Sequence, residues 1–287
     1  MNIYAAVILA ALVLSFLLGL IAEILNLRAL RDELPEEFVG VYDADAYGKS
    51  QEYTRVKTDF GFLTSAFDLL VTLAFWFAGG FHYLDSIVRN WNLNPILTGL
   101  AYIGILVALR SALWLPFGIY RTFVIEERFG FNKTTPRTYI TDILKALALG
   151  VLLGVPLLSG VLAFFQYAGS AAWLYCWLVT TVFALFMQFI APTWILPLFN
   201  KFVPLPEGEL RHAILSYAQS VRFSLKNVFV MDGSRRSSKA NAFFTGFGKN
   251  KRIALFDTLI ERQSVPGLVA ILAHEIGHYK KRHIIQE

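Results

Sequence analysis

Three residues near the end of the chain have the types and spacing of a hydrolytic metal site. His274, Glu275 and His278 lie in the stretch LVAILAHEIGHYKKRHI, which runs over residues 268–284. On a helix, side chains four residues apart share one face, so both imidazoles can bind the same metal ion. Glu275 lies about 100° around the helix from His274 and can reach a water near that ion. This HExxH pattern predicts two zinc ligands and a general base for peptide-bond hydrolysis.

A chance occurrence of the motif is the alternative interpretation, because three fixed positions alone are weak evidence. The motif lies in an apolar helical stretch that begins Val269-Ala270-Ile271-Leu272-Ala273. Burial of two unpaired histidines and a carboxylate in such a stretch would be costly. The sequence therefore favours metal binding over chance.

The third zinc ligand is harder to find. His283 is only five residues after His278 and, on a continuing helix, points about 140° away from it. Glu287 is placed no better, and His82 and His212 are expected to be polar surface residues. In one large class of zinc proteases the third ligand is a glutamate from a later helix, which here would lie beyond residue 287.

The histidine helix is expected to begin near Val265 and to belong to a small α+β segment. A helix is predicted around Leu210–Val221 and a strand over Asn227–Asp232. A hairpin is predicted from two strands, near Asn241–Thr245 and Arg252–Phe256, joined by a Gly-Lys-Asn turn.

Composition indicates that the rest of the chain is a polytopic membrane protein. The 287 residues are 56% hydrophobic and 15% aromatic, and the mean hydropathy is +0.52. The single cysteine, Cys176, excludes an intramolecular disulfide and a cysteine-rich metal site. Five apolar runs are long enough to cross a bilayer. They are Ile3 to about Leu25, about Phe62–Phe81, Ile96–Tyr120, Ile143–Phe165 and Ala171–Leu198, the last with Pro192 and Pro197 expected to kink its final turns.

Basic residues predict how these runs are oriented. Lys and Arg gather after the first, third and fifth runs, whereas the loops after the second and fourth carry one and none. The positive-inside rule then places the N-terminus outside and everything after Leu198 in the cytoplasm. The net charge of +5 and pI near 9.2 are explained by this distribution, so a nucleic-acid partner is not expected.

Polar residues within the apolar runs have two possible explanations. Glu23, Asp68 and Arg110 could line a water-filled chamber, together with Thr180, Thr181 and Gln188. The charged residues could instead form structural ion pairs or extend toward the membrane surface.

The sequence resembles the type I CAAX prenyl endopeptidases, integral-membrane zinc metalloproteases of gluzincin type. The resemblance extends over nearly the whole chain and rests on several stretches together. These are KSQEYTRVKTDFG (49–61), TFVIEERFGFNKTT (122–135), PLFNKFVPLPEGEL (197–210), DGSRRSSKANAFFTGFGKNKRIALFDTL (232–259) and LAHEIGHYKKRH (272–283).

The resemblance implies an all-α membrane fold of seven helices around a chamber, with a small α+β cytoplasmic metalloprotease segment. Five of those helices are expected here, in a domain over residues 1–200, followed by a zinc metallopeptidase domain over residues 201–287 that is incomplete at its C-terminus. One zinc ion is implied, and its third ligand, a glutamate, is expected beyond residue 287. We therefore expect an N-terminal fragment.

The resemblance also implies a substrate-binding edge. Asn241 and Ala242 are implied to contact a peptide substrate through the backbone, although an ordinary hairpin that packs on the metal helix is equally compatible with the sequence. Residues 49–55 and 126–135 are expected to be cytoplasmic loops.

Three functions remain open at this point. The first is a zinc-dependent endopeptidase in the bacterial inner membrane or the endoplasmic reticulum, which would act on prenylated C-terminal CAAX peptides or in membrane-protein quality control. Its partners would be peptide substrates and membrane lipid. The second is an inactive membrane scaffold or pseudoprotease, and the third, which does not explain Glu275, is transport through the chamber.

Overall fold

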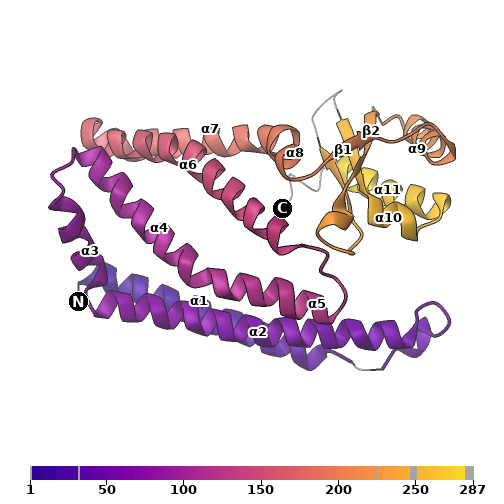
Figure 1. Cartoon of the computed structure of the whole chain (residues 1–287), viewed down its shortest axis with the longest axis horizontal. Coiled ribbons are helices and arrows are strands. Elements are labelled where there is room, and N and C mark those ends of the chain that lie inside the picture. The colour runs from indigo at the N-terminus through magenta and orange to yellow at the C-terminus, as the bar shows by residue number, and fades with distance from the viewer. Residues whose placement is uncertain (1, 32, 224, 246–250, 282–287) are drawn as a thin grey trace. The chain divides into compact units, whose positions relative to one another are not determined.

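The computed structural model describes residues 2–31, 33–223, 225–245 and 251–281, and it divides into two compact units over residues 1–129 and 130–287. Long helices dominate both units, and a four-stranded sheet belongs to the second (Figure 1). Five helical stretches have the length and hydropathy of membrane spans, which confirms the predicted number. They are Ile3–Ala29, Ala44–Phe77, Pro95–Arg128, Pro136–Tyr167 and Gly169–Phe199.

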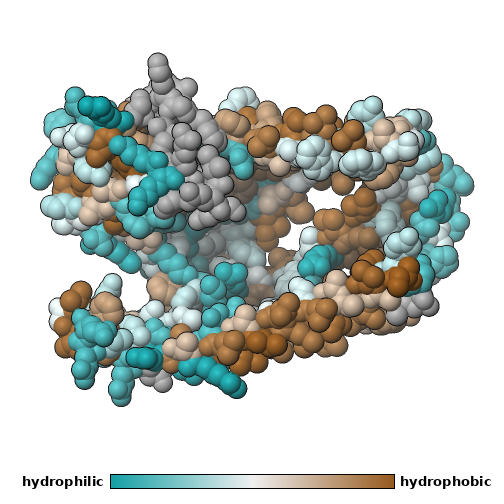
Figure 2. Space-filling view, turned by 180° about the vertical axis from the view of Figure 1, so that it is seen from behind, coloured by the Kyte–Doolittle hydropathy of each residue, from teal (hydrophilic) through white to brown (hydrophobic). Residues whose placement is uncertain are grey.

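The first unit contains three of the spans and a short amphipathic helix. Figure 2 shows hydrophobic side chains covering much of the long helices, as expected for surfaces that face lipid. The elements are α1 (Ile3–Ala29), η1 (Glu36–Phe38), α2 (Ala44–Phe77), α3 (Gly80–Arg89), α4 (Pro95–Tyr120), the π-helical turn η2 (Arg121–Ile125) and α5 (Glu126–Arg128).

Two predicted boundaries in the membrane helices were wrong. Helix α2 begins at Ala44, well before the predicted Phe62, because Asp43 caps its N-terminus by accepting a 2.7 Å hydrogen bond from the Ala46 N–H. Residues 49–55 are therefore helical and do not form the expected loop. Helix α6 (Pro136–Tyr167) likewise begins before the predicted Ile143, because Thr135 caps it ahead of Pro136.

The last span ends irregularly, as its prolines predicted. Helix α7 (Ala172–Ile190) follows the short η3 (Gly169–Ala171) and continues into a π-helical turn, η4 (Ala191–Ile195), before α8 (Leu196–Phe199). Pro192 has no N–H to donate to the preceding turn, so regular helical hydrogen bonding is interrupted there. The Thr193 hydroxyl donates to the Phe189 carbonyl at 2.8 Å and satisfies one backbone acceptor of this turn.

The remaining elements of the second unit form a mixed sheet with helices on one face. The strand order is β1-β2-β4-β3, with β2 parallel to β4 and the other two pairs antiparallel. The predicted strands correspond to β2, β3 and β4, whereas β1 and the parallel pairing were not predicted; the predicted Gly-Lys-Asn turn lies outside the described residues. The elements are β1 (Phe202–Pro204), α9 (Glu209–Ser220), β2 (Leu225–Met231), η5 (Gly233–Arg235), β3 (Ala242–Thr245), β4 (Lys251–Phe256), α10 (Asp257–Arg262) and α11 (Val265–Lys280).

Candidate metal centre

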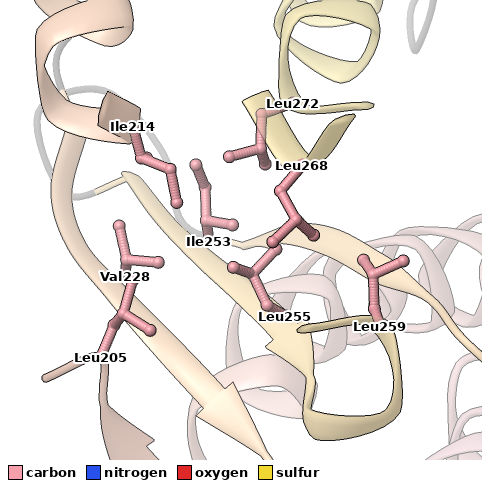
Figure 3. Packing of buried hydrophobic residues seen from close by; sticks show 8 residues of the cluster. All are labelled: Leu205, Ile214, Val228, Ile253, Leu255, Leu259, Leu268 and Leu272. Carbon is pink, nitrogen blue, oxygen red and sulfur yellow. The ribbon is translucent and has the colours of Figure 1, made fainter. Parts of the chain in front are cut away.

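Helix α11 is held on the sheet by a buried apolar stripe. Ser264 caps its N-terminus, where the Ser264 hydroxyl accepts a hydrogen bond from the Gly267 N–H at 3.3 Å. Leu268, Leu272 and Ile276 are four residues apart, and each is at most 2% exposed. Figure 3 shows Leu268 and Leu272 directed toward the β4 side chains, with Ile214 of α9 on the same face of the sheet. This packing fixes which side of α11 faces away from the core.

His274 and His278 project from that other side. Each histidine is two residues, or about 200°, after a residue of the buried stripe. Their Nε2 atoms are 3.0 Å apart, and their ring centroids are 4.6 Å apart. Both side chains are exposed and Glu275 is half-buried. The burial cost weighed in the sequence does not apply to the histidines, because the apolar residues of α11 follow a single stripe that excludes them.

The donor set fits a zinc ion. Tetrahedral zinc with Zn–N bonds of about 2.0–2.1 Å separates two ligand nitrogens by about 3.3 Å, close to the observed spacing. Two imidazoles and an adjacent carboxylate are the side chains that hydrolytic zinc sites use. Within the described residues, no group of three or more metal-binding side chains comes together.

The other ligand candidates do not complete the site. His283 and Glu287 lie outside the described residues. His82 and His212 are exposed, as predicted. His212 belongs to α9, and its Nε2 atom lies 3.8 Å from a carboxylate oxygen of Glu207. A third ligand beyond residue 287 therefore remains a prediction.

Strand β3 forms one edge of the sheet, and Asn241 is the residue directly before this strand. The Phe256 N–H donates to the Asn241 carbonyl at 3.0 Å, so Asn241 is paired toward β4. Peptide groups alternate along an antiparallel edge strand, so those of Ala242 and Phe244 face the open edge. The Asn241 side chain already accepts the Ala242 N–H at 2.8 Å. The two residues implied to contact substrate through the backbone thus differ: the Ala242 carbonyl faces the open edge, whereas the Asn241 carbonyl is paired with β4.

The loop GSRRSSKA (residues 233–240) contains a residue with several partners that the sequence did not single out. The Arg236 guanidinium donates to Asp142 of α6, to the Asn200 side chain and to the Phe199 carbonyl. No periodicity marks this arginine, because its partners lie in other elements. The one available signal was Asp142 itself, a carboxylate directly before the apolar run predicted from Ile143.

Both explanations left open by the sequence, an ion pair and the lining of a hollow, apply to the intramembrane charges of the first unit. Arg110 of α4 and Asp68 of α2 form an ion pair of 2.9 Å. Both also line an open groove of about 910 Å³, together with Glu23 of α1 and Lys57. In the second unit, the Thr180 hydroxyl donates to the Cys176 carbonyl of its own helix and needs no chamber for its hydrogen bond.

Comparison with protein families gives two adjoining similarities. Residues 23–201 match the family model described as "CAAX prenyl protease N-terminal, five membrane helices". Residues 204–287, which include the histidine pair, match that of peptidase family M48.

Individual proteins show the same similarity. The CAAX prenyl protease 1 homolog of Arabidopsis thaliana is 39% identical over 87% of this chain and 61% of its own length. CAAX prenyl protease 1 of Saccharomyces cerevisiae is 38% identical over 88% of this chain and 58% of its own. The crystal structure of S. mikatae Ste24p superposes on the whole chain, which covers 69% of it, with a TM-score of 0.89 and 34% identity. The chain thus spans about three fifths of the length of these two curated relatives.

Proposed function

Because the chain belongs to the CAAX prenyl protease family of M48 peptidases, we propose that it forms the membrane and metal-binding part of a zinc-dependent endopeptidase. The relatives are named CAAX prenyl proteases, and on that basis the substrate class we propose is the C-terminal peptide of prenylated proteins. The observation that carries the proposal is the pair of histidine Nε2 atoms, 3.0 Å apart beside Glu275 on a helix fixed to the sheet.

His274 and His278 are the proposed zinc ligands, with a third ligand beyond residue 287. A zinc ion held there would supply Lewis-acid polarisation and would lower the pKa of its bound water to about 7. Glu275 lies one position along the helix from His274, and its carboxylate accepts a proton from the attacking water. The same carboxylate then returns the proton to the leaving amine.

Strand β3 is the proposed substrate edge. An extended peptide adds to an open strand through main-chain hydrogen bonds. The outward Ala242 carbonyl and the outward N–H and carbonyl of Phe244 are placed for that pairing, whereas the Ala242 N–H already donates to the Asn241 side chain. The proposed role of Asn241 is to hold the start of this edge, because its carbonyl bonds Phe256 and its side chain bonds Ala242.

The distribution of basic residues supports a topology with the N-terminus outside and the metallopeptidase segment in the cytoplasm. Prenylated C-terminal peptides are membrane-associated, so a peptidase segment that is carried on membrane helices suits the proposed substrate. We also propose that the chain has a membrane domain over residues 1–200 and a metallopeptidase domain over residues 201–287.

The test is peptide hydrolysis by a form of the protein extended to the relatives' length. We expect cleavage of a prenylated CAAX peptide, slower cleavage of the same peptide without the prenyl group, and no cleavage by Glu275→Gln. The proposal is overturned if the extended protein binds zinc but cleaves neither peptide faster than Glu275→Gln does. That result would favour a non-catalytic scaffold.

A further inference from the structure

The Arg236 side chain connects the loop before β3 to the ends of two membrane helices. Its Nε and Nη2 atoms donate to the two carboxylate oxygens of Asp142 on α6, at 2.7 and 2.9 Å. Nη1 donates to the Asn200 side chain at 2.8 Å, and Nη2 also donates to the Phe199 carbonyl at the end of α8, at 2.7 Å. The Arg236 and Asp142 side chains are only 22% and 23% exposed. A two-point arginine–carboxylate pair of this kind fixes orientation as well as distance.

The backbone of the same loop is joined to the segment that leads into α6. The Lys133 N–H donates to the Arg236 carbonyl and the Ser238 N–H donates to the Phe131 carbonyl, both at 3.0 Å. Between these two bonds, Asn132 and Ser237 form an antiparallel bridge. Residues 130–134, for which the sequence suggested only a cytoplasmic loop, thus form a short ladder with residues 236–238.

The loop continues from this anchor directly to the proposed substrate edge. The Thr258 hydroxyl donates to the Lys239 carbonyl at 2.9 Å, and the Asn241 carbonyl accepts the Phe256 N–H. Asn241 is five residues after Arg236, so even a fully extended chain keeps the two residues within about 17 Å of each other. The anchor at Arg236 therefore limits where β3 can begin relative to α6.

We propose that Arg236 is a positioning residue that sets the separation between the membrane helix α6 and the substrate edge β3. This inference rests on the proposed function. A substrate held in the bilayer by its lipid reaches β3 from the membrane, so this separation determines which peptide bond lies beside Glu275. Arg236 thereby acts on substrate affinity and on the position of cleavage, without touching substrate or zinc.

Three variants test the proposal. Arg236→Gln removes both the charge and the planar guanidinium that makes two hydrogen bonds to Asp142. Arg236→Lys keeps the charge but removes the planar guanidinium. Arg235→Gln is the matched control, because the neighbouring Arg235 is exposed and its side chain makes no hydrogen bond or ion pair with any described residue. Hydrogen exchange is measured on the 287-residue chain in detergent, and kinetics and cleavage products on the extended protein.

For Arg236→Gln we expect amides of residues 237–243 to exchange at least about tenfold faster, while those of α9 and α11 keep their protection. We also expect KM to rise about tenfold with kcat within about twofold, an unchanged zinc content and a second cleavage position in the products. Arg236→Lys should lie between Arg236→Gln and the parent in each readout, and Arg235→Gln should match the parent.

Two results would overturn the proposal. Unchanged exchange over residues 237–243 would mean that Arg236 does not hold the start of β3. Equal loss of protection in α9 and α11 would mean that Arg236 stabilises the whole segment and has no specific positioning role. If the extended parent protein hydrolyses no peptide, the proposed function fails, and the exchange experiment still decides whether Arg236 positions β3.

Discussion

The Nε2 atoms of His274 and His278 lie 3.0 Å apart on successive turns of α11, on the side opposite its buried apolar stripe. The core therefore fixes the side of α11 that carries both imidazoles. This spacing suits two ligands of one zinc ion, which we propose these histidines to be. The third ligand that we propose would then approach from the exposed side of α11.

Zinc content is expected to depend on this pair. The form extended to the relatives' length should hold about one zinc per chain, and His278→Ala should lower its content to about a tenth or less, because only one histidine of the pair remains. Elemental analysis of the purified protein measures this. His212→Ala is the control, since His212 is also exposed but lies on α9. If the 287-residue chain holds zinc as tightly as the extended form, the expectation of a ligand beyond residue 287 is wrong.

Glu275→Gln should separate hydrolysis from metal binding. Loss of a general base lowers the rate by about 10²- to 10⁴-fold, whereas the amide leaves both histidines in place. We expect kcat to fall by that factor while the zinc content stays constant. Glu261→Gln, on the exposed surface of α10, is the matched control and should leave both unchanged. A parallel loss of zinc and activity in Glu275→Gln would indicate that Glu275 is a structural residue.

Features encoded by local pattern could be predicted from the sequence. The third span was expected from Ile96 and α4 begins at Pro95, because a continuous apolar run closely follows Asn94, which caps the helix. Strand β4 includes the expected Arg252–Phe256 because β-branched and aromatic residues mark it. The spacing of His274 and His278 predicted their shared face for the same reason.

Features that depend on tertiary partners were not predicted. The parallel pairing of β2 with β4 joins segments that are far apart in sequence, and no local pattern specifies it. The start of α2 was also missed, although its Asp43 cap is local, because residues 44–61 are polar enough to be mistaken for a loop. Arg236 was missed because the sequence does not show that Asp142, 94 positions earlier, lies beside it.

The groove that holds the Asp68–Arg110 pair is expected to contain water. Charged side chains inside membrane helices are stabilised by a partner or by hydration, and here the pair lines an open space. In a Cys176→Ser background, which has no cysteine, Ser65→Cys introduces a thiol at the groove. This thiol should react with a charged methanethiosulfonate at least about tenfold faster than Leu70→Cys, because thiolate forms only where water reaches it.

Leu70 is a suitable control because it lies on the same helix and is exposed, but it does not line the groove. Mass spectrometry of the labelled protein in proteoliposomes gives both rates. Equal, slow labelling at the two positions would show that the groove is dry, and the ion pair would then be a structural one.

The packing of α11 predicts a stability effect that is separable from the metal. Leu272 is 1% exposed and packs among Leu268, Ile253 and Leu255. Leu272→Ala should therefore lower the free energy of unfolding of the metallopeptidase segment by about 2–5 kcal/mol, through lost burial and the cavity that remains. Val203→Ala, at a 56% exposed position on β1, should change it by less than about 0.5 kcal/mol. Denaturant dependence of hydrogen exchange in α11 measures both, and equal effects would contradict the orientation of α11 that places His274 and His278 on its outer face.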